Sequence, residues 1–217
     1  MESRYKCIIF DFDGTLADTH EGIIRTYQET IRLLGLPVPS VERITSTIGL
    51  ELKDGLKAGV DGMTEEQAQE ACRIYREIFP TIAIPCIKAF PGVPELMKSL
   101  NDKGLRLAIA TSRSHHSLDD LARRLGIDGY FEGLFGAEDV KNHKPAPDLV
   151  LLILEKLGVK ADEALVVGDA TYDLVMGKGA GCEVCGVTWG NQSREKLSTA
   201  APEYIVDTLD ELSKLIQ

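Results

Sequence analysis

The sequence changes from apolar to acidic within CIIFDFDGT, residues 7–15, and this stretch decides the fold. It begins with a short apolar run, which is typical of a strand buried on both faces of a sheet. Two carboxylates follow at once, Asp11 and Asp13, and Gly14 permits a tight turn after them. We therefore expect a buried first strand whose carboxyl end carries acidic side chains.

Similar short apolar runs alternate with helical patterns along most of the 217 residues. Strands are expected at 7–10, 105–110, 134–136, 164–167, 183–187 and 204–206. Apolar residues at helical spacing predict helices near 93–100, 118–125, 147–157 and 209–216. This alternation predicts an α/β fold, with a Rossmann-like, mostly parallel sheet and helices on both of its faces.

Residues 20–85 interrupt the alternation, because they contain helical patterns and no convincing strand. Within them, TEEQ at 64–67 reads as a capping box that starts a helix. The simplest interpretation is an all-helical insert between the first strand and the rest of the sheet. We expect an α/β core at 1–18 and 87–217, an inserted helical domain at 19–86, and hinges near 17–19 and 85–91.

Polar side chains follow three of the predicted strands at the point where each strand ends. Asp11 follows the first strand, Thr111 follows the second, and Asp169 comes one glycine after the strand at 164–167. In an open α/β sheet, ligands bind in the crevice beyond the carboxyl ends of the strands. The sequence therefore predicts that these three side chains share one site.

Two further charged residues suit that site. Asp173 lies four residues after Asp169 at a predicted helix start, so both can face the same point. With Asp11 they offer three carboxylates to a hard cation, and Mg²⁺ suits such oxygen ligands. Lys144, held between His143 and Pro145 in HKPAP, could offset the repulsion between the carboxylates.

Composition and charge exclude several classes of function. The net charge is −10 and the pI is about 4.9, with no cluster of basic residues, so we expect no nucleic-acid partner and no anionic membrane surface. No apolar run is long enough to span a bilayer, and the N-terminus does not resemble a signal peptide. The five cysteines are odd in number and scattered, which favours a reducing, cytoplasmic location.

Taken together, these motifs resemble the haloacid dehalogenase-like superfamily of phosphotransferases over essentially the whole chain. Its four motifs match DFDGT at 11–15, Thr111, Lys144, and Asp169 with Asp173. The helical insert is similar to the C1 cap of that superfamily, and the tail from 186 to 206 resembles its phosphoglycolate phosphatase and pyrophosphatase-like branch. True dehalogenases of the superfamily lack a carboxylate at the position of Asp13, so a dehalogenase is not expected.

The resemblance implies a Mg²⁺-dependent phosphatase that hydrolyses a small phosphomonoester through a phosphoaspartate. Asp11 would be the nucleophile and Asp13 the acid and base, while Thr111 and Lys144 would stabilise the phosphoryl oxygens. Metal ligands would be Asp11, the Asp13 carbonyl, Asp169 and Asp173. Substrate would contact Gly14, Thr15, Ser112, Arg113, Gly49 and Lys53, the last two in a cap loop near residues 47–53.

Several alternatives stay open at this point. A β-phosphoglucomutase-like phosphotransferase would need a second phosphate anchor in the cap, which Lys53 could supply. An inorganic pyrophosphatase is a weaker alternative. A non-catalytic phosphoacceptor or binding protein is also weaker, since Asp13, Lys144 and Asp169 are all present. The expected partner is a small phosphorylated metabolite such as phosphoglycolate, a sugar phosphate or a nucleotide, bound by a monomer or a homodimer.

Overall fold

The computed structural model describes residues 4–216, so the predicted domain limits at 1 and 217 lie outside the described residues. Its main sheet has six strands in the order β5-β4-β1-β6-β7-β8, and every neighbouring pair is parallel. The strands are β1 Cys7–Phe10, β4 Arg106–Ala110, β5 Gly133–Phe135, β6 Ala164–Gly168, β7 Glu183–Val187 and β8 Tyr204–Val206. Each predicted strand is confirmed, with ends that differ by no more than one residue.

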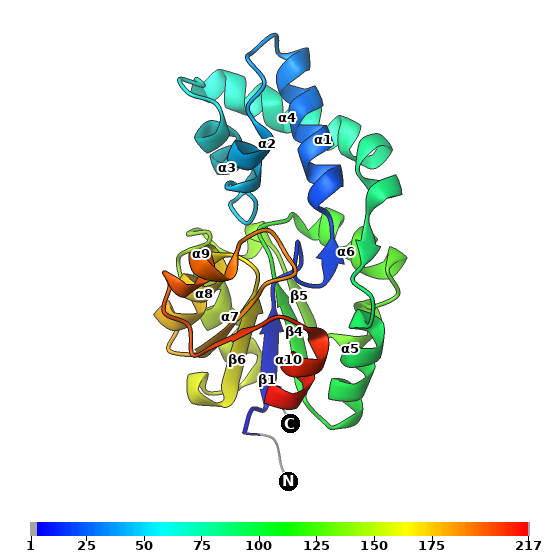
Figure 1. Ribbon diagram of the computed structural model, residues 1–217, viewed down its shortest axis with the longest axis vertical. Coiled ribbons are helices and arrows are strands. Elements are labelled where there is room, and N and C mark those ends of the chain that lie inside the picture. The colour runs from blue at the N-terminus through cyan, green and yellow to red at the C-terminus, as the bar shows by residue number, and fades with distance from the viewer. Residues whose placement is uncertain (1–3, 217) are drawn as a thin grey trace.

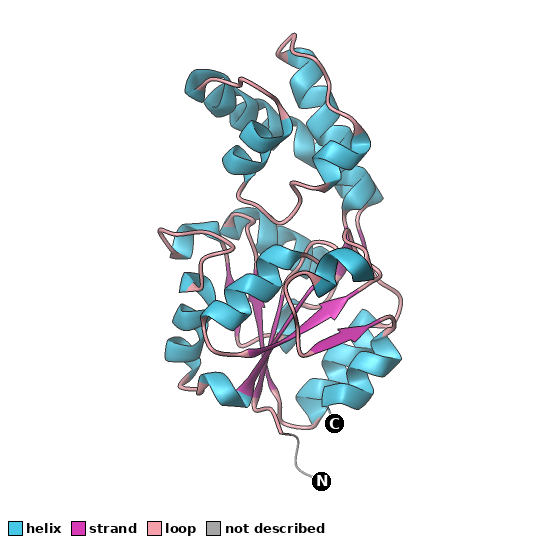
Figure 2. Cartoon of the chain, turned by 60° about the vertical axis from the view of Figure 1, so that its left-hand side comes forward, coloured by secondary structure: helices cyan, strands magenta, loops and turns pink. Residues whose placement is uncertain are grey.

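Helices cover both faces of this sheet, as expected for an α/β fold (Figures 1 and 2). Ile8 and Phe10 of β1 belong to one buried cluster, and Cys7 and Ile9 belong to the other, because successive side chains of a strand point to opposite faces. The first face is covered by α5 Val93–Asp102, α6 His115–Arg124 and α10 Leu209–Ile216. The second face is covered by α7 Asp148–Leu157, α8 Thr171–Gly179 and α9 Arg194–Ser198. The central strand is therefore wholly buried.

Four helices form the insert, which lies above the carboxyl edge of the sheet (Figure 1). They are α1 His20–Leu33, α2 Val41–Thr45, α3 Leu52–Gly59 and α4 Glu65–Ile82. The predicted capping box is confirmed, since Thr64 and Gln67 exchange side-chain-to-backbone hydrogen bonds at the start of α4. A short antiparallel ribbon of β2 Ala17–Asp18 and β3 Lys88–Ala89 joins the insert, which we call the cap, to the sheet.

The sequence did not predict α2 and α3, for a physical reason. Both are short, and short helices depend on caps and on packing rather than on propensity. Ser40 and Glu51 cap them with their side chains. Gly59 lowers the helix propensity of α3, yet a Cβ at this position would lie 2.0 Å from the Tyr27 hydroxyl oxygen on α1. Packing between α1 and α3 therefore requires a glycine at position 59, and this glycine weakens the helical pattern in the sequence.

The strands are added to the sheet on two different sides of β1. The chain adds β4 and β5 on one side of β1, and then crosses to add β6, β7 and β8 on the other side. A crevice opens at the carboxyl ends of the strands beside such a switch point.

Four 3₁₀ turns complete the described part of the fold: η1 Ile84–Cys86, η2 Asp128–Tyr130, η3 Ala137–Asp139 and η4 Ala161–Glu163. No helix within residues 4–216 is both long and apolar enough to cross a membrane.

Candidate active site

Three neighbouring strands deliver polar side chains to the switch point, as the sequence predicts. Asp11 follows β1, Thr111 follows β4 and Asp169 follows β6. Sheet hydrogen bonds continue into the site, because the Asp11 N–H donates to the Val167 carbonyl at 2.8 Å. All three side chains are almost fully buried. The rigid edge of the sheet therefore fixes where these groups lie.

Asp11, Asp169 and Asp173 form a compact carboxylate cluster. One oxygen of each lies within 4.8 Å of the others, and all three residues are buried. Asp173 stands in the first turn of α8, where its other oxygen accepts the Ala170 N–H at 3.1 Å. The cluster therefore combines a strand end and a helix start, as the four-residue spacing predicts.

Lys144 is the cation that faces this cluster. Its Nζ lies 2.5 Å from Asp11 Oδ1 and 2.7 Å from Asp173 Oδ1, and the side chain is only 1% exposed. A cis peptide bond links Lys144 to Pro145 in the loop before α7. Burial opposes the charge of Lys144, but Asp11 and then Asp173 outweigh it and raise the pKa of the ammonium. The lysine is therefore a permanent positive charge between two carboxylates.

One ammonium does not balance three buried carboxylates. Burial, and then repulsion from Asp173, raises the pKa of Asp11 well above its ordinary value. The same two causes raise the pKa of Asp169 to about 7, although hydrogen bonds from Asn191 act in the opposite direction. All the donors are oxygen atoms of carboxylates, which are the ligands that a hard divalent cation prefers. The donor set fits Mg²⁺.

Glycine at position 14 makes room for Asp169. The backbone of Gly14 is left-handed, with φ +82°, and a Cβ there would lie 2.2 Å from Asp169 Oδ2. The Gly14 N–H donates to the Ala17 carbonyl at 2.8 Å and closes the turn. Thr15 is buried, and its hydroxyl lies 3.4 Å from Asp169 Oδ1.

Asp13 is held by Arg113. The guanidinium Nε and Nη2 donate to the two carboxylate oxygens at 2.7 and 2.6 Å. Side chains of both residues are largely buried, 12% and 10% exposed. The Arg113 Cζ lies 5.0 Å from the Phe79 ring centroid, so the pair also contacts the cap helix α4. Asp13 and Arg113 are thus neighbours, and both line the pocket described next.

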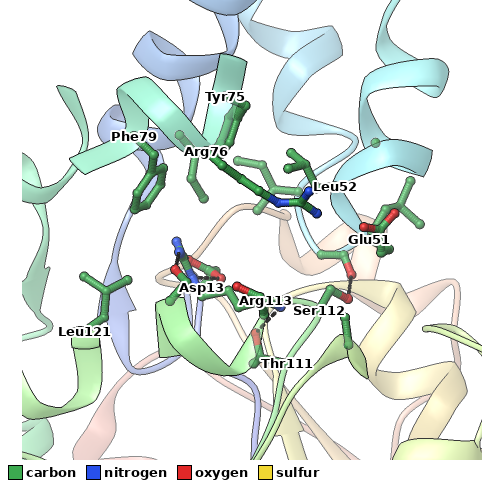
Figure 3. A pocket seen from close by; sticks show the side chains of 18 of the residues that line it. Asp13, Glu51, Leu52, Tyr75, Arg76, Phe79, Thr111, Ser112, Arg113 and Leu121 are labelled. Carbon is green, nitrogen blue, oxygen red and sulfur yellow. Dashed lines mark hydrogen bonds and ion pairs between the residues drawn. The ribbon is translucent and has the colours of Figure 1, made fainter. Parts of the chain in front are cut away.

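A pocket of about 570 Å³ lies between the cap and the edge of the sheet (Figure 3). Asp11, Asp13 and Thr111 line its floor, and Ser112 joins the floor to the cap loop by donating to the Gly49 carbonyl at 2.7 Å. Much of the upper wall is apolar. It includes Ile23, Tyr27, Leu52, Tyr75, Phe79, Pro80 and Ile84 from the cap and the turn after it. Gly49 and Arg113 also line the pocket, as expected of substrate-contacting residues.

Lys53 is placed elsewhere. Its Nζ pairs with Glu65 at 2.8 Å on the surface of the cap, and among the described residues it is not one that lines the pocket. As the second residue of α3 it projects about 100° around the helix axis from Leu52, which does line the pocket. The structure therefore does not support a contact between Lys53 and a substrate in this pocket.

Two residues of the site were missed by sequence reasoning. Asn191 donates its N–H and its Nδ2 to Asp169 Oδ2 at 2.6 and 2.7 Å. Arg76 extends from α4 across the pocket (Figure 3). The rule that follows strand ends does not find Asn191, because Thr188 is the first polar residue after β7. Nothing in the sequence distinguishes Arg76 from the other surface arginines of the cap.

Comparisons with known proteins agree with this geometry. The sequence profile of a family described as "Haloacid dehalogenase-like hydrolase" matches residues 8–187. A protein named "Probable phosphatase IndB" from Dickeya dadantii is 37% identical, with 94% of this chain and 90% of that protein covered. A 5′-nucleotidase from Pseudomonas aeruginosa is 32% identical, with 99% and 96% covered. The crystal structure of a predicted phosphatase from Clostridium acetobutylicum superposes with a TM-score of 0.87 at 30% identity, with 98% of each chain covered.

Proposed function

This chain belongs to the haloacid dehalogenase-like hydrolases and is a phosphatase of that family, and from this premise we propose its reaction. The enzyme hydrolyses a small phosphomonoester through an aspartyl phosphate on Asp11. One observation carries the proposal. A buried Asp11 carboxylate stands at a sheet edge between Lys144 and an accessible pocket, so it can meet a phosphorus atom while its charge is held in place.

The carboxylates of Asp11, Asp169 and Asp173, with the Asp13 carbonyl, would hold Mg²⁺, which when bound neutralises phosphate charge. The protein's own groups supply the rest. Lys144 Nζ acts to lower the pKa of Asp11, orients its carboxylate, and would offer its remaining donor to a phosphoryl oxygen. The hydroxyl of Thr111, at the end of the adjacent strand, is a second donor toward the same oxygens. Losing one such donor costs about 10²–10³ in rate.

Asp13 has the acid and base role. Its carboxylate lies in the pocket, two residues beyond the nucleophile. In the first step the Asp11 oxygen bonds to phosphorus and the ester bond to the alcohol breaks, while Asp13, which has taken up a proton from solvent beforehand, gives that proton to the leaving oxygen. In the second step Asp13 takes a proton from the water that cleaves the phosphoaspartate. Asp11 and Asp13 then return to their starting states.

Residues 19–86 act as a cap domain over a core formed by 1–18 and 87–217. The β2–β3 ribbon lies at the junction and would be the hinge. The cap would exclude water from the phosphoaspartate when closed, and it would select the alcohol by its pocket wall. The β-phosphoglucomutase-like alternative loses its main support, because Lys53 pairs with Glu65 instead of offering a phosphate anchor.

The test is phosphate release from a panel of phosphate esters, each assayed with Mg²⁺ and with EDTA. We expect Mg²⁺-dependent release, and its loss in Asp11→Asn with the fold retained. Asp102→Asn is the matched control, since Asp102 is an exposed aspartate paired with Lys98. Turnover in the Asp11→Asn protein, or release that EDTA does not change, would contradict the mechanism.

We also propose a cytoplasmic location, because all five cysteines are free thiols. The expected state of monomer or homodimer stays a prediction, which light scattering would decide.

A further inference from the structure

The ion pair between Asp13 and Arg113 occupies both oxygens of the proposed acid. Nε donates to Oδ2 at 2.7 Å, and Nη2 donates to Oδ1 at 2.6 Å. Such a bidentate ion pair is among the strongest contacts between a guanidinium and a carboxylate. In this arrangement both oxygens of Asp13 accept a hydrogen bond from the guanidinium. Asp13 must therefore give up at least one of these hydrogen bonds before that oxygen can exchange a proton with a substrate in the pocket.

Separation is costly because of where the pair lies. The two side chains are 12% and 10% exposed, and much of the wall above them is apolar. Arg113 would keep its contact with Ser117 Oγ at 2.9 Å and the Phe79 and Phe12 rings at 5.0 and 5.8 Å. None of these is an anion. A buried charge that loses its partner is strongly unfavourable, by an amount equivalent to roughly 10²–10³ in an equilibrium constant.

We propose that the substrate supplies the missing partner: the alcohol released by this enzyme carries its own negative charge, a carboxylate or a second phosphate, which takes over the Arg113 guanidinium. The inference rests on the proposed phosphatase function and names its substrate class. Arg113 is then the specificity-determining residue. It releases Asp13 toward the ester only when an anionic leaving group replaces that carboxylate, so esters of neutral alcohols bind without freeing the acid.

The other charges of the pocket agree with an anionic leaving group. Three of its carboxylates already accept hydrogen bonds from other groups: Asp120 from Arg124 at 2.7 Å, Glu138 from the His115 N–H at 3.0 Å, and Glu51 from the Lys53 N–H at 2.8 Å. Arg76 also lines the pocket, and within residues 4–216 it forms no ion pair. Besides Arg113 on the core side, the pocket therefore has Arg76 as a second cation, on its cap side.

A matched pair of esters tests the proposal. Phosphoglycolate and ethyl phosphate have the same two-carbon frame, but only the first carries a carboxylate on the leaving group. With Mg²⁺ present, we expect kcat/KM for phosphoglycolate to exceed that for ethyl phosphate by roughly 10²–10³. In Arg113→Met the ratio should fall below about tenfold, because phosphoglycolate loses the partner of its carboxylate while ethyl phosphate gains an Asp13 that is no longer held. Arg113→Lys, which keeps the charge with fewer donors, should give an intermediate ratio.

Control variants separate this role from a general effect of charge. Arg73→Met removes an arginine of α4, the cap helix that also carries Arg76. Arg73 is paired with Glu70 and Glu77, so this change should leave the ratio of kcat/KM for the two esters unchanged. Arg76→Met tests whether Arg76, instead of Arg113, binds the negative charge of the leaving group. Because Arg113→Met could unfold, the affinities of both esters are also measured by calorimetry in Asp11→Asn, which is expected to bind without turnover. Phosphoglycolate should bind at least tenfold more tightly there.

Each outcome decides between the two proposals. Equal kcat/KM and equal affinity for the two esters would overturn the role of Arg113 while leaving the phosphatase function intact. A preference that survives Arg113→Met, or that disappears in Arg76→Met alone, would overturn it as well. Failure to release phosphate from any ester with Mg²⁺ would instead contradict the proposed function itself.

Discussion

Replacing Lys144 with methionine tests how the carboxylate cluster is held together. The change keeps a side chain of similar length and removes the only ammonium that contacts Asp11 and Asp173 among the described residues. Lys144 is almost fully buried, so water cannot replace the lost contacts without opening the site. The variant therefore contains buried carboxylates that no longer have a cationic partner.

The magnitude follows from the burial of these groups. Removing one partner of a buried ion pair costs about 3–5 kcal/mol, because the other charge stays in a medium that solvates it poorly. For a domain of this size, 1 kcal/mol corresponds to about 2–4 °C in Tm. We thus expect Tm to fall by roughly 6–20 °C in EDTA at pH 8. Lys53→Met is the matched control, and its exposed pair with Glu65 should contribute no more than about 1 kcal/mol.

The dependence on pH distinguishes a charge effect from a cavity. Burial and Asp173 already raise the pKa of Asp11 above its ordinary value, and loss of Lys144 raises it further. A carboxyl group with a raised pKa in the folded state binds more protons there than when unfolded, so stability falls as pH rises through that interval. The destabilisation should therefore be smaller at pH 5.5 than at pH 8. A cavity alone would give the same loss at both values.

The assay is urea unfolding of both proteins in EDTA and in Mg²⁺, at the two pH values. Mg²⁺ should stabilise the variant more than the wild type, because the cluster without Lys144 is more negative. Turnover should still fall by about 10²–10³ at saturating Mg²⁺. A variant that unfolds like Lys53→Met in EDTA at pH 8 would refute the view that Lys144 stabilises the cluster by its charge.

Three further predictions concern the same edge of the sheet and its surroundings. Mg²⁺ binding near pH 7 should release protons and weaken as pH falls, because the pKa of Asp169 is about 7; calorimetry in buffers of different ionisation enthalpy measures this release. Gly14→Ala should sharply raise the Mg²⁺ concentration needed for activity, since its Cβ would lie 2.2 Å from Asp169, whereas Gly35→Ala, also left-handed but in open space, should only cost about 1–2 kcal/mol of stability. The hydrogen bond to Asp139 raises the pKa of His115, so its stabilisation is complete below about 6.5 and is lost at higher pH. Asp139→Asn should accordingly lower Tm more at pH 5.5 than at pH 9.

The sequence predicted the sheet and the carboxylate cluster for the same reason. Strands buried on both faces appear as unbroken apolar runs, and the first polar residue after each run marks the edge of the sheet. Asp11, Thr111 and Asp169 could be placed together from this rule alone. Asn191 lies in the loop after β7 but is not the first polar residue there, since Thr188 precedes it, and a neutral amide gives no sign of chemistry until its contact with Asp169 is seen.

Residues on the cap side could not be predicted in the same way. Which side chain of the cap faces the pocket depends on how α3 and α4 are oriented above the sheet, and no local pattern encodes that orientation. Lys53 and Leu52 are neighbours in sequence, yet only Leu52 lines the pocket. Arg113 and Asp13 are 100 residues apart, and their contact depends on β1 and β4 being adjacent in the sheet. Long-range packing, rather than propensity, decides these contacts.

The energetics of the site explain why these distant contacts matter for its chemistry. The fold places three carboxylates at a buried edge where each raises the energy of the others, and the pKa of Asp169 is raised to about 7 by burial first and by repulsion from Asp173 second. Such an arrangement persists only because the surrounding sheet is rigid and because Lys144 offsets part of the charge. In the proposed mechanism a divalent cation would relieve this repulsion by its charge. The carboxylates that destabilise the free protein would therefore be the groups that favour cation binding in that mechanism.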